Sequence, residues 1–438
     1  MKILLVFPRI EHGASTYSDT GVWKIVFGYP IITLPHIAAI TPDKYNVKIV
    51  NENYSELDFD EDADVVGITC YTMTAPRAYR IADEFRKRGK TVIMGGYHVT
   101  ALPDEALQHC DCVIKGLAEV NWPRALKDFE NGKLKSIYER DHDFDISKIP
   151  PLKRELIKHN PFLGALQTTK GCPHKCEFCA ISSFCGSMVK QRPIKDVVNE
   201  IKNMSNKIYI IHDPHLTLNR KYAIELFKEL IRQKVKKQWI ANGTTNVLAE
   251  ADEKFLNLAS KAGCVEWFVG FESVNQEALL ETKKTHNKVE NFNKLINRCH
   301  KYGMTVQGGI IFGFDHDKPD VFDITLETIN KWYLDVLEVN ILTPYPGTKL
   351  YEKLDKQGRI LTKDWSHYNQ VEVVFEPKNM TPKELYNGAR KVAKEFYSIP
   401  DILVRDARII STVRNIGSLI PAFTNFSFRK YYKQDFNF

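Results

Sequence analysis

The stretch of residues 168–179 reads TTKGCPHKCEFC and contains three of the nine cysteines of the chain. Its three cysteines, Cys172, Cys176 and Cys179, have the spacing C-x3-C-x2-C directly after a short strand-like segment. A loop of that length can bring three thiolates onto one face of a cubane iron–sulfur cluster and leave the fourth iron without a protein ligand. An open metal position is what a catalytic centre needs, because a substrate can bind there.

A structural zinc site with Cys185 as its fourth ligand is the alternative to a cluster. The chain has nine cysteines, and no secretory leader is recognised because the apolar run Ile3–Phe7 is too short. No stretch reaches the length of a membrane span. We therefore expect a cytoplasmic protein, in which clustered cysteines are metal ligands or catalytic groups and not disulfides.

Strand-like and helix-like segments alternate over residues 161–350, which we predict to be one domain. Six strand-like pieces are each followed by a helical or turn-rich segment, and they are Leu166–Thr168, Ile208–Ile211, Gln238–Ala241, Trp267–Phe271, Gln307–Phe312 and Val336–Leu342. This pattern predicts a partial (β/α)6 barrel of the TIM type, with its chemistry at the carboxyl ends of the strands. The cysteine motif would follow the first strand.

A second alternating pattern fills residues 1–135 and predicts a doubly wound, Rossmann-like α/β domain. Ligands bind such sheets beyond the carboxyl ends of the strands, where this chain carries small and hydroxyl-bearing residues. Residues 136–160 are charged, contain Pro150–Pro151 and are predicted to be a linker. Residues 351–438 are predicted to be mainly helical. Their basic and aromatic end, Phe423–Phe438, could be a packing helix, an amphipathic cap, a membrane-surface element or a substrate lid.

The cysteine motif and the barrel pattern resemble the radical S-adenosylmethionine (SAM) superfamily over most of residues 161–350. The resemblance implies a [4Fe–4S] cluster on Cys172, Cys176 and Cys179, with SAM bound at the open iron and cleaved to a radical. It further implies that SAM is contacted by Phe178, Asp213, Glu272, Gly309 and Tyr345. Two positions depart from the family pattern: His212 stands where relatives carry an acid, and Thr244–Asn246 where they often carry an arginine.

The first domain resembles the cobalamin-binding module that precedes the radical domain in one large subfamily. The matching segments are Val65–Thr74, Met94–Pro103 and Cys112–Glu119. The resemblance implies that cobalamin is bound by Thr69, Tyr71, Thr72, Thr74, Gly95, Gly96, His98 and Gly116. The Asp-x-His-x-x-Gly segment that supplies a lower ligand elsewhere is absent, and the nearest histidine, His12, does not fit it. A Rossmann-like scaffold without ligand, with His98 as a structural histidine, is the alternative.

Together the two resemblances imply a cobalamin-dependent radical SAM methyltransferase. The radical would take hydrogen from an unactivated carbon, and that carbon would then take a methyl group from methylcobalamin. The same parts also permit a radical cyclase or rearrangement enzyme that uses cobalamin without net methylation. A hypothesis of another class is a non-catalytic metal-binding regulatory protein.

The composition indicates which partners to expect. The formal net charge is +7 over 438 residues, a mild excess that fits a lysine-rich surface and gives little support to nucleic-acid binding. We expect a small-molecule substrate, either a lipid or an anionic metabolite, and no nucleic acid. The family resemblance implies a flavodoxin or ferredoxin as electron donor.

Overall fold

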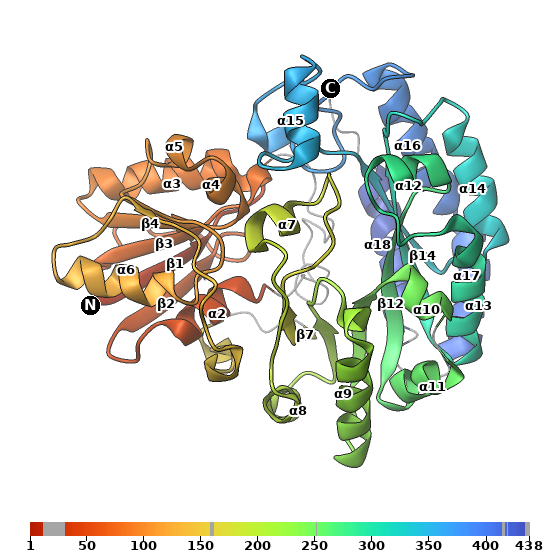
Figure 1. The fold of residues 1–438 in the computed structure, drawn as a ribbon, viewed down its shortest axis with the longest axis horizontal. Helices are drawn as coiled ribbons and strands as arrows, with labels where there is room; N and C mark the ends of the chain where they lie inside the picture. Colours follow the sequence, from red (N-terminus) through yellow and green to blue (C-terminus); the bar gives the residue numbers. More distant parts are fainter. Residues whose placement is uncertain (12–30, 158–161, 251, 414–416, 418, 434–438) are drawn as a thin grey trace.

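The computed structural model describes residues 1–11, 31–157, 162–250, 252–413, 417 and 419–433 (Figure 1). Two parallel six-stranded sheets lie side by side and are followed by a helical carboxyl-terminal region. His12 and the end of the tail, residues 434–438, lie outside the described residues. None of the described helices is long and apolar enough to cross a membrane.

The first sheet has the strand order β2-β1-β3-β4-β5-β6, and its neighbouring strands are all parallel. Its strands are β1 (Lys2–Phe7), β2 (Asn46–Asn51), β3 (Val65–Thr69), β4 (Thr91–Gly95), β5 (Cys112–Ile114) and β6 (Ile137–Tyr138). Its helices are α2 (Thr33–Ile40), α3 (Ala75–Lys87), α4 (Tyr97–Ala101), α5 (Pro103–Ala106) and α6 (Asn121–Glu130), with a short 3-10 turn η1 (Thr72–Thr74). The doubly wound architecture is confirmed, but β6 lies in the segment 136–160 that the sequence predicts to be a linker.

Strand β1 shows why this sheet is covered on both faces. Leu4 and Val6 pack into one apolar core with α3, whereas Ile3 and Leu5 pack into another with α2 and α6. Successive side chains of a strand point to opposite faces, so a continuous apolar run fits only a sheet that is buried on both sides. Figure 1 shows α3 and α6 on opposite faces of the sheet.

The second sheet has the order β14-β13-β12-β11-β10-β7, again all parallel, which confirms the partial six-stranded barrel. Its strands are β7 (Leu163–Leu166), β10 (Ile208–Ile211), β11 (Gln238–Gly243), β12 (Cys264–Glu272), β13 (Thr305–Phe312) and β14 (Val336–Ile341). The connecting helices are α8 (Ile194–Asn203), α9 (Arg220–Arg232), α10 (Thr245–Glu250), α11 (Glu253–Lys261), α12 (Gln276–Glu281), α13 (Phe292–Lys301) and α14 (Val321–Lys331). Between β7 and α8 lie a small hairpin, β8 (Thr169–Lys170) with β9 (Lys190–Gln191), and α7 (Ala180–Cys185).

The barrel stays open between β7 and β14, so β14 is an edge strand whose backbone groups need partners. The hydroxyl of Tyr397 accepts from the amide of Leu337 and donates to its carbonyl, at 3.0 and 2.5 Å. Tyr432 does the same for Val339, at 2.8 and 3.0 Å. Two tyrosines of the carboxyl-terminal region, Tyr397 at the end of α16 and Tyr432 of α18, thus occupy backbone groups of the edge strand that could otherwise pair with another strand.

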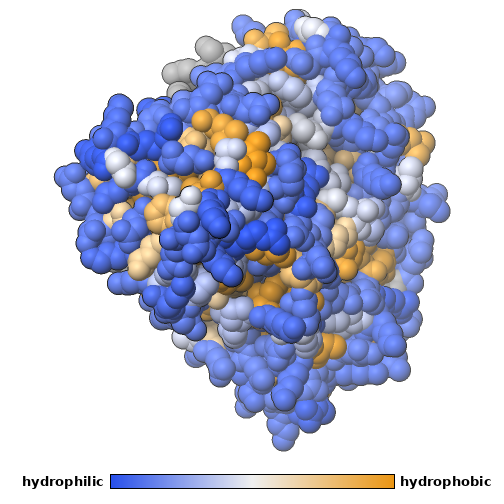
Figure 2. All heavy atoms as spheres, turned by 60° about the vertical axis from the view of Figure 1, so that its left-hand side comes forward, coloured by the Kyte–Doolittle hydropathy of each residue, from blue (hydrophilic) through white to orange (hydrophobic). Residues whose placement is uncertain are grey.

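The carboxyl-terminal region is helical, as expected, and comprises α15 (Lys349–Lys356), α16 (Pro382–Phe396), α17 (Ile399–Val413) and α18 (Leu419–Lys433). Phe428, Tyr431 and Tyr432 of α18 are buried in the barrel core, so the described part of the tail packs as an ordinary helix. Between α15 and α16 the chain returns to the first domain, where Trp365 and Tyr368 join its core. On the face in Figure 2, hydrophilic residues predominate and apolar residues gather in separate patches.

Candidate active site

The cysteine loop, residues 171–179, begins directly after β8. Gly171 has a φ of +84°, and a Cβ atom at this position would lie 1.8 Å from the carbonyl oxygen of Met188. Only glycine fits such a backbone at such a distance. Farther along, the amide of Glu177 donates to the carbonyl of Thr282 at 3.1 Å. The loop is therefore fixed both at its start and near its second cysteine.

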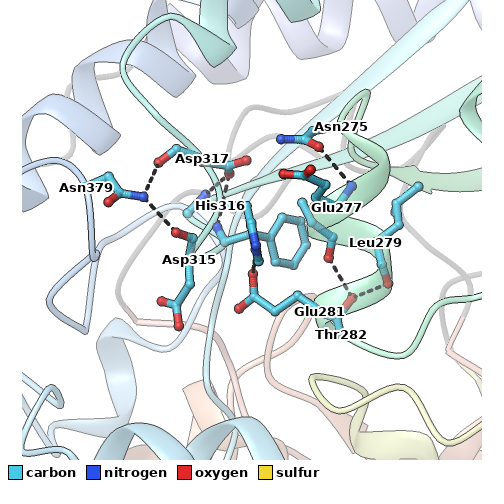
Figure 3. Close-up of polar contacts among 12 residues, drawn as sticks. Asn275, Glu277, Leu279, Glu281, Thr282, Asp315, His316, Asp317 and Asn379 are labelled. Atoms are coloured by element: carbon cyan, nitrogen blue, oxygen red, sulfur yellow. Dashed lines mark hydrogen bonds and ion pairs between the residues drawn. The ribbon is translucent and has the colours of Figure 1, made fainter.

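The rim beside Thr282 is a network of polar contacts between α12 and the loop after β13 (Figure 3). His316 Nδ1 lies 2.8 Å from Glu281 Oε2, which joins the two loops directly. The carboxylate of Asp317 accepts from the amides of Gly313 and Phe314 at 2.9 and 3.0 Å. These contacts hold the segment that receives the cysteine loop.

The three thiols of the loop lie near one another. Cys172 is buried, and Cys176 and Cys179 are half-buried. Burial raises the pKa of each thiol, that of Cys176 to about 11, and the nearby ammonium of Lys284 opposes the shift. Among the described residues, no three His, Cys, Asp or Glu side chains converge on a single metal ion. Three thiols on one loop are the donors that hold an iron–sulfur cluster, and iron supplies the charge that stabilises them as thiolates.

A cavity of about 620 Å³ lies beyond the carboxyl ends of the first sheet and reaches the barrel. It is lined by six of the residues that the sequence predicts to bind cobalamin, namely Thr69, Tyr71, Thr74, Gly95, Gly96 and Gly116. Its far wall includes Gly171 and His212 from the barrel side. A Cβ at Gly96 would lie 2.6 Å from the carbonyl oxygen of Cys70, and φ there is +114°. The cavity has the size of ligand sites and a glycine-built wall, so these residues fit a large cofactor.

A second cavity, of about 320 Å³, lies between the first one and the top of the barrel. The two cavities share Tyr71, Met73, Tyr97 and Ile181 in their walls. The second is also lined by Thr72, by Phe178 and Cys179 of the cysteine loop, and by Tyr345. Thr72 therefore faces this cavity and not the first. A molecule in the second cavity would lie between the cysteine loop and the first cavity.

Glu272 stands at the end of β12 in a left-handed backbone conformation, with φ of +66°. Its carboxylate forms an ion pair with Lys284, and the two side chains are only 12% and 7% exposed. Lys284 Nζ also donates to the carbonyl of Gly270 at 3.0 Å. Gly309 lies opposite Gly270 on the neighbouring strand. A bulge between Gly270 and Glu272 thus directs the carboxylate toward Lys284, a partner that no sequence pattern indicates.

Asp213 lies where the sequence places it, at the end of β10, but its carboxylate is fully buried. One oxygen accepts from the amides of Thr168 and Thr169 at 2.7 and 2.9 Å, and the other accepts from the Thr168 hydroxyl. Both oxygens are therefore occupied by the segment that leads into the cysteine loop. In this structure Asp213 positions that segment and does not present a free oxygen to a ligand.

His98 does not reach either cavity. Its side chain is completely buried, its Nε2 lies 3.2 Å from Glu105 Oε1, and its ring packs edge-on against Trp365. The indole nitrogen of Trp365 donates to the same carboxylate at 3.0 Å. His98 thus helps to attach the returning carboxyl-terminal segment to the first domain. Sequence position alone could not show this, because Trp365 is 267 residues away (365 − 98).

Cys185, the fourth ligand of the alternative zinc site, is buried at the end of α7 and lines the first cavity. Its thiol faces a group of polar residues that the sequence did not single out. Burial raises the pKa of Cys185 to about 11, Lys170 opposes that shift and Glu119 adds to it. Lys170, Glu119 and His36 line the same wall of the cavity.

Two family models match this chain. The model of the radical SAM superfamily matches residues 166–329, and that of the B12 binding domain matches residues 33–125. The first covers the cysteine loop and most of the barrel, and the second covers most of the wall of the first cavity. The order of the two domains is the one that the sequence predicts.

Curated relatives match nearly the whole chain. Bacteriochlorophyllide d C-8(2)-methyltransferase of Chlorobaculum tepidum is 30% identical over 423 residues, which are 90% of this chain and 90% of that protein. An anaerobic magnesium-protoporphyrin IX monomethyl ester cyclase of Cereibacter sphaeroides is 25% identical over 91% of this chain and 70% of its own length.

A solved structure has a similar fold over nearly the full length of the chain. It is the radical SAM methyltransferase TsrM of Kitasatospora setae with cobalamin and a [4Fe–4S] cluster bound, at a TM-score of 0.70, 15% identity and 99% coverage of both chains. The cysteine loop, the two cavities and these matches lead to one conclusion: the chain belongs to the cobalamin-dependent radical SAM methyltransferase family, whose cofactors are a [4Fe–4S] cluster, SAM and cobalamin.

Proposed function

We propose that this enzyme transfers a methyl group from methylcobalamin to an unactivated carbon, after hydrogen abstraction by the 5′-deoxyadenosyl radical. The observation that carries the proposal is the second cavity, whose wall includes Phe178 and Cys179 from the cysteine loop and Tyr71 and Tyr97 from the cobalamin side. A substrate carbon in that cavity would have one cofactor on each side. When bound, the cluster with SAM supplies the radical and cobalamin supplies the methyl group.

The residues of the second cavity indicate an apolar substrate with a few polar groups. Aromatic and aliphatic side chains form most of the wall, and Thr343, Asn340 and Gln370 supply hydroxyl and amide groups. Apolar surroundings with few polar groups orient a ligand and keep water away from a reactive radical. We propose an apolar ring molecule related to the bacteriochlorophyllides on which the relatives from Chlorobaculum act.

In this proposal the protein positions the reactants and moves no proton in the methyl-transfer step. Phe178 lies 6.3 Å from Phe314, ring centroid to ring centroid, and this contact fixes one side of the cavity. Glu272, held by Lys284, and Gly309, which leaves room at its strand, would lie against SAM. Tyr345 is half-buried, and desolvation of its hydroxyl raises its pKa above the usual value, so the hydroxyl stays neutral as a donor toward substrate or SAM.

The product balance tests methyl transfer. Anaerobic enzyme with cobalamin, SAM, a chemical reductant and bacteriochlorophyllide d as the probe should form 5′-deoxyadenosine and S-adenosylhomocysteine in equal amounts, with a methylated pigment. Formation of 5′-deoxyadenosine without S-adenosylhomocysteine, at any substrate, would instead support the cyclase or rearrangement alternative. The specific observation that favours this alternative is that a cyclase is among the relatives.

The reductant and the compartment belong to the proposal as well. A low-potential flavodoxin or ferredoxin is the electron donor that we propose for the cluster. The cytoplasm is the proposed location, since its reducing conditions keep thiolate ligands free of disulfides. Reconstitution with a purified flavodoxin, its reductase and NADPH should replace the chemical reductant.

A further inference from the structure

Three ionisable side chains form a buried triad in the wall of the first cavity. They are His36 of α2, Glu119 from the segment between β5 and α6, and Lys170 of β8. Their side chains are 14%, 3% and 10% exposed. The triad joins the cobalamin-binding domain to the strand that leads into the cysteine loop, two residues before Cys172.

All the contacts inside the triad fall on one oxygen of the carboxylate. Glu119 Oε1 lies 2.5 Å from Lys170 Nζ and 3.0 Å from His36 Nε2, and these two nitrogens are 3.3 Å apart. Within the part of the chain that the structure describes, Glu119 Oε2 is buried and has no hydrogen-bond partner. Leaving a buried carboxylate oxygen without a donor is costly, because the oxygen has lost its hydrogen bonds to water and gained none in the protein. Such an atom at a cavity wall points to a donor on the ligand.

The charge state of the triad defines the donor. Burial by itself would raise the pKa of Glu119, but Lys170 and His36 together lower it well below its usual value, so the carboxylate is ionised. Burial and the charge of Lys170 lower the pKa of His36, so its imidazole is neutral. Lys170 therefore already balances the one negative charge. A second cation is not needed, and the group that fits Glu119 Oε2 is a neutral N–H or O–H donor.

We propose that Glu119 Oε2 accepts a hydrogen bond from one of the peripheral carboxamides of cobalamin, and that the triad thereby fixes the corrin relative to the cysteine loop. The inference rests on the cobalamin site and not on methyl transfer, so its tests are binding measurements. A carboxamide is a neutral donor, and the corrin carries several of them around its edge. Lys170 and His36 orient the carboxylate and are positioning residues.

The first test replaces the carboxylate by an amide. Glu119→Gln keeps the shape and one carbonyl oxygen for Lys170, but it can no longer offer two acceptors. The dissociation constant of hydroxocobalamin, followed by its absorbance under anaerobic conditions, should rise about tenfold, which corresponds to roughly 1.4 kcal/mol. Iron content and the electron paramagnetic resonance spectrum of the reduced cluster should stay as in the wild type. Glu139→Gln is the matched control, because Glu139 is 71% exposed and pairs with Lys115 at the surface.

Two outcomes of this test would overturn the proposal. One is a dissociation constant within twofold of the wild-type value. The other is a parallel loss of iron and cobalamin, which would mean that Glu119 only holds Lys170 and the strand before the cysteine loop in place.

The second test leaves the protein unchanged and alters the ligand, so it does not depend on the folding of a variant. Cobalamin monocarboxylates, in which one carboxamide at a time is hydrolysed, form a set of probes. One member should bind the wild type at least tenfold more weakly than the others, because two buried carboxylates would face each other. Glu119→Gln should remove that difference, since its amide can donate to the new carboxylate. Equal binding of all members, or a difference that persists in Glu119→Gln, would refute the contact.

Discussion

The two parallel sheets have strand ends of opposite character. The first sheet ends in Thr69, in Gly95–Gly96 and, after β5, in Gly116, which leave space and carry no charge. The barrel ends in groups such as Asp213 and Glu272, each held by partners within the protein. A sheet edge that binds a large cofactor carries small residues, which leave room for it. An edge that holds reacting atoms is made by fixing polar groups in place.

This contrast predicts that the two cofactor sites can be damaged separately. Substitutions that add volume should affect the first sheet, and substitutions that remove a thiol or a charge should affect the barrel.

Cys176→Ala should abolish the cluster while leaving cobalamin binding intact. Two thiols cannot replace the three that hold the cubane, so the brown colour and the cleavage of SAM should be lost completely. Iron analysis and the absorbance of anaerobically purified protein measure the cluster, and a cobalamin titration measures the other site. Loss of both cofactors would show that the two edges are not independent. Retention of one tightly bound zinc ion in the wild type would contradict the cluster itself.

Gly96→Ala should weaken cobalamin binding while leaving the cluster intact. The added Cβ would lie 2.6 Å from the carbonyl oxygen and 2.9 Å from the amide nitrogen of Cys70, and φ of +114° is unfavourable for alanine. The turn after β4 must therefore shift, at a cost of roughly 1–3 kcal/mol, and cobalamin affinity should fall at least tenfold. The cluster should be retained.

Gly132→Ala is the control for this substitution. Gly132 also has a positive φ, of +65°, but nothing lies within 4 Å of its added Cβ. It should lower the melting temperature slightly without changing cobalamin affinity. An equal loss of cobalamin in both variants would attribute the effect to backbone strain in general and not to the wall of the cavity.

Lys284→Met tests the ion pair between Glu272 and Lys284 at the carboxyl end of β12. It leaves Glu272 as a buried carboxylate without its partner, and breaking such a pair costs about 3–5 kcal/mol. We expect SAM affinity to fall about tenfold or more, measured by equilibrium dialysis with the reconstituted cluster, while cobalamin affinity stays unchanged. Lys288→Met, at an exposed lysine on the same loop, is the control. Unchanged SAM binding in Lys284→Met would mean that Glu272 does not contribute to the SAM site.

Glu266→Gln gives the smallest effect and concerns the opposite end of β12. Burial raises the pKa of Glu266 to about 8, so the folded protein keeps this carboxyl protonated far above the value near 4.5 of an exposed group. The contribution of this protonated carboxyl to the free energy of unfolding is fully present below pH 4.5 and is lost as the pH rises through about 8. Glutamine does not titrate. The melting temperature of the variant should therefore exceed that of the wild type by an amount that grows between pH 5 and pH 8, to roughly 2–4 °C. A constant difference would contradict the shifted pKa.

The parts of the site that could be predicted from the sequence are those whose residues are close in the chain. Three cysteines within eight residues, the glycines at strand ends and the six-fold strand–helix alternation are local patterns, and they sufficed for the fold class, the domain order and the cofactors. Strand periodicity and loop length follow from backbone geometry, so such patterns persist whatever the tertiary neighbours are.

The tertiary fold determines which side chains face a ligand. It turned His98 toward Glu105 and Trp365, and it tied Asp213 to the segment before the cysteine loop. It also paired Glu272 with Lys284 and assembled His36, Glu119 and Lys170 from elements far apart in the chain. A buried polar atom must find a partner wherever folding brings one, and such partners come from distant segments that no local pattern connects.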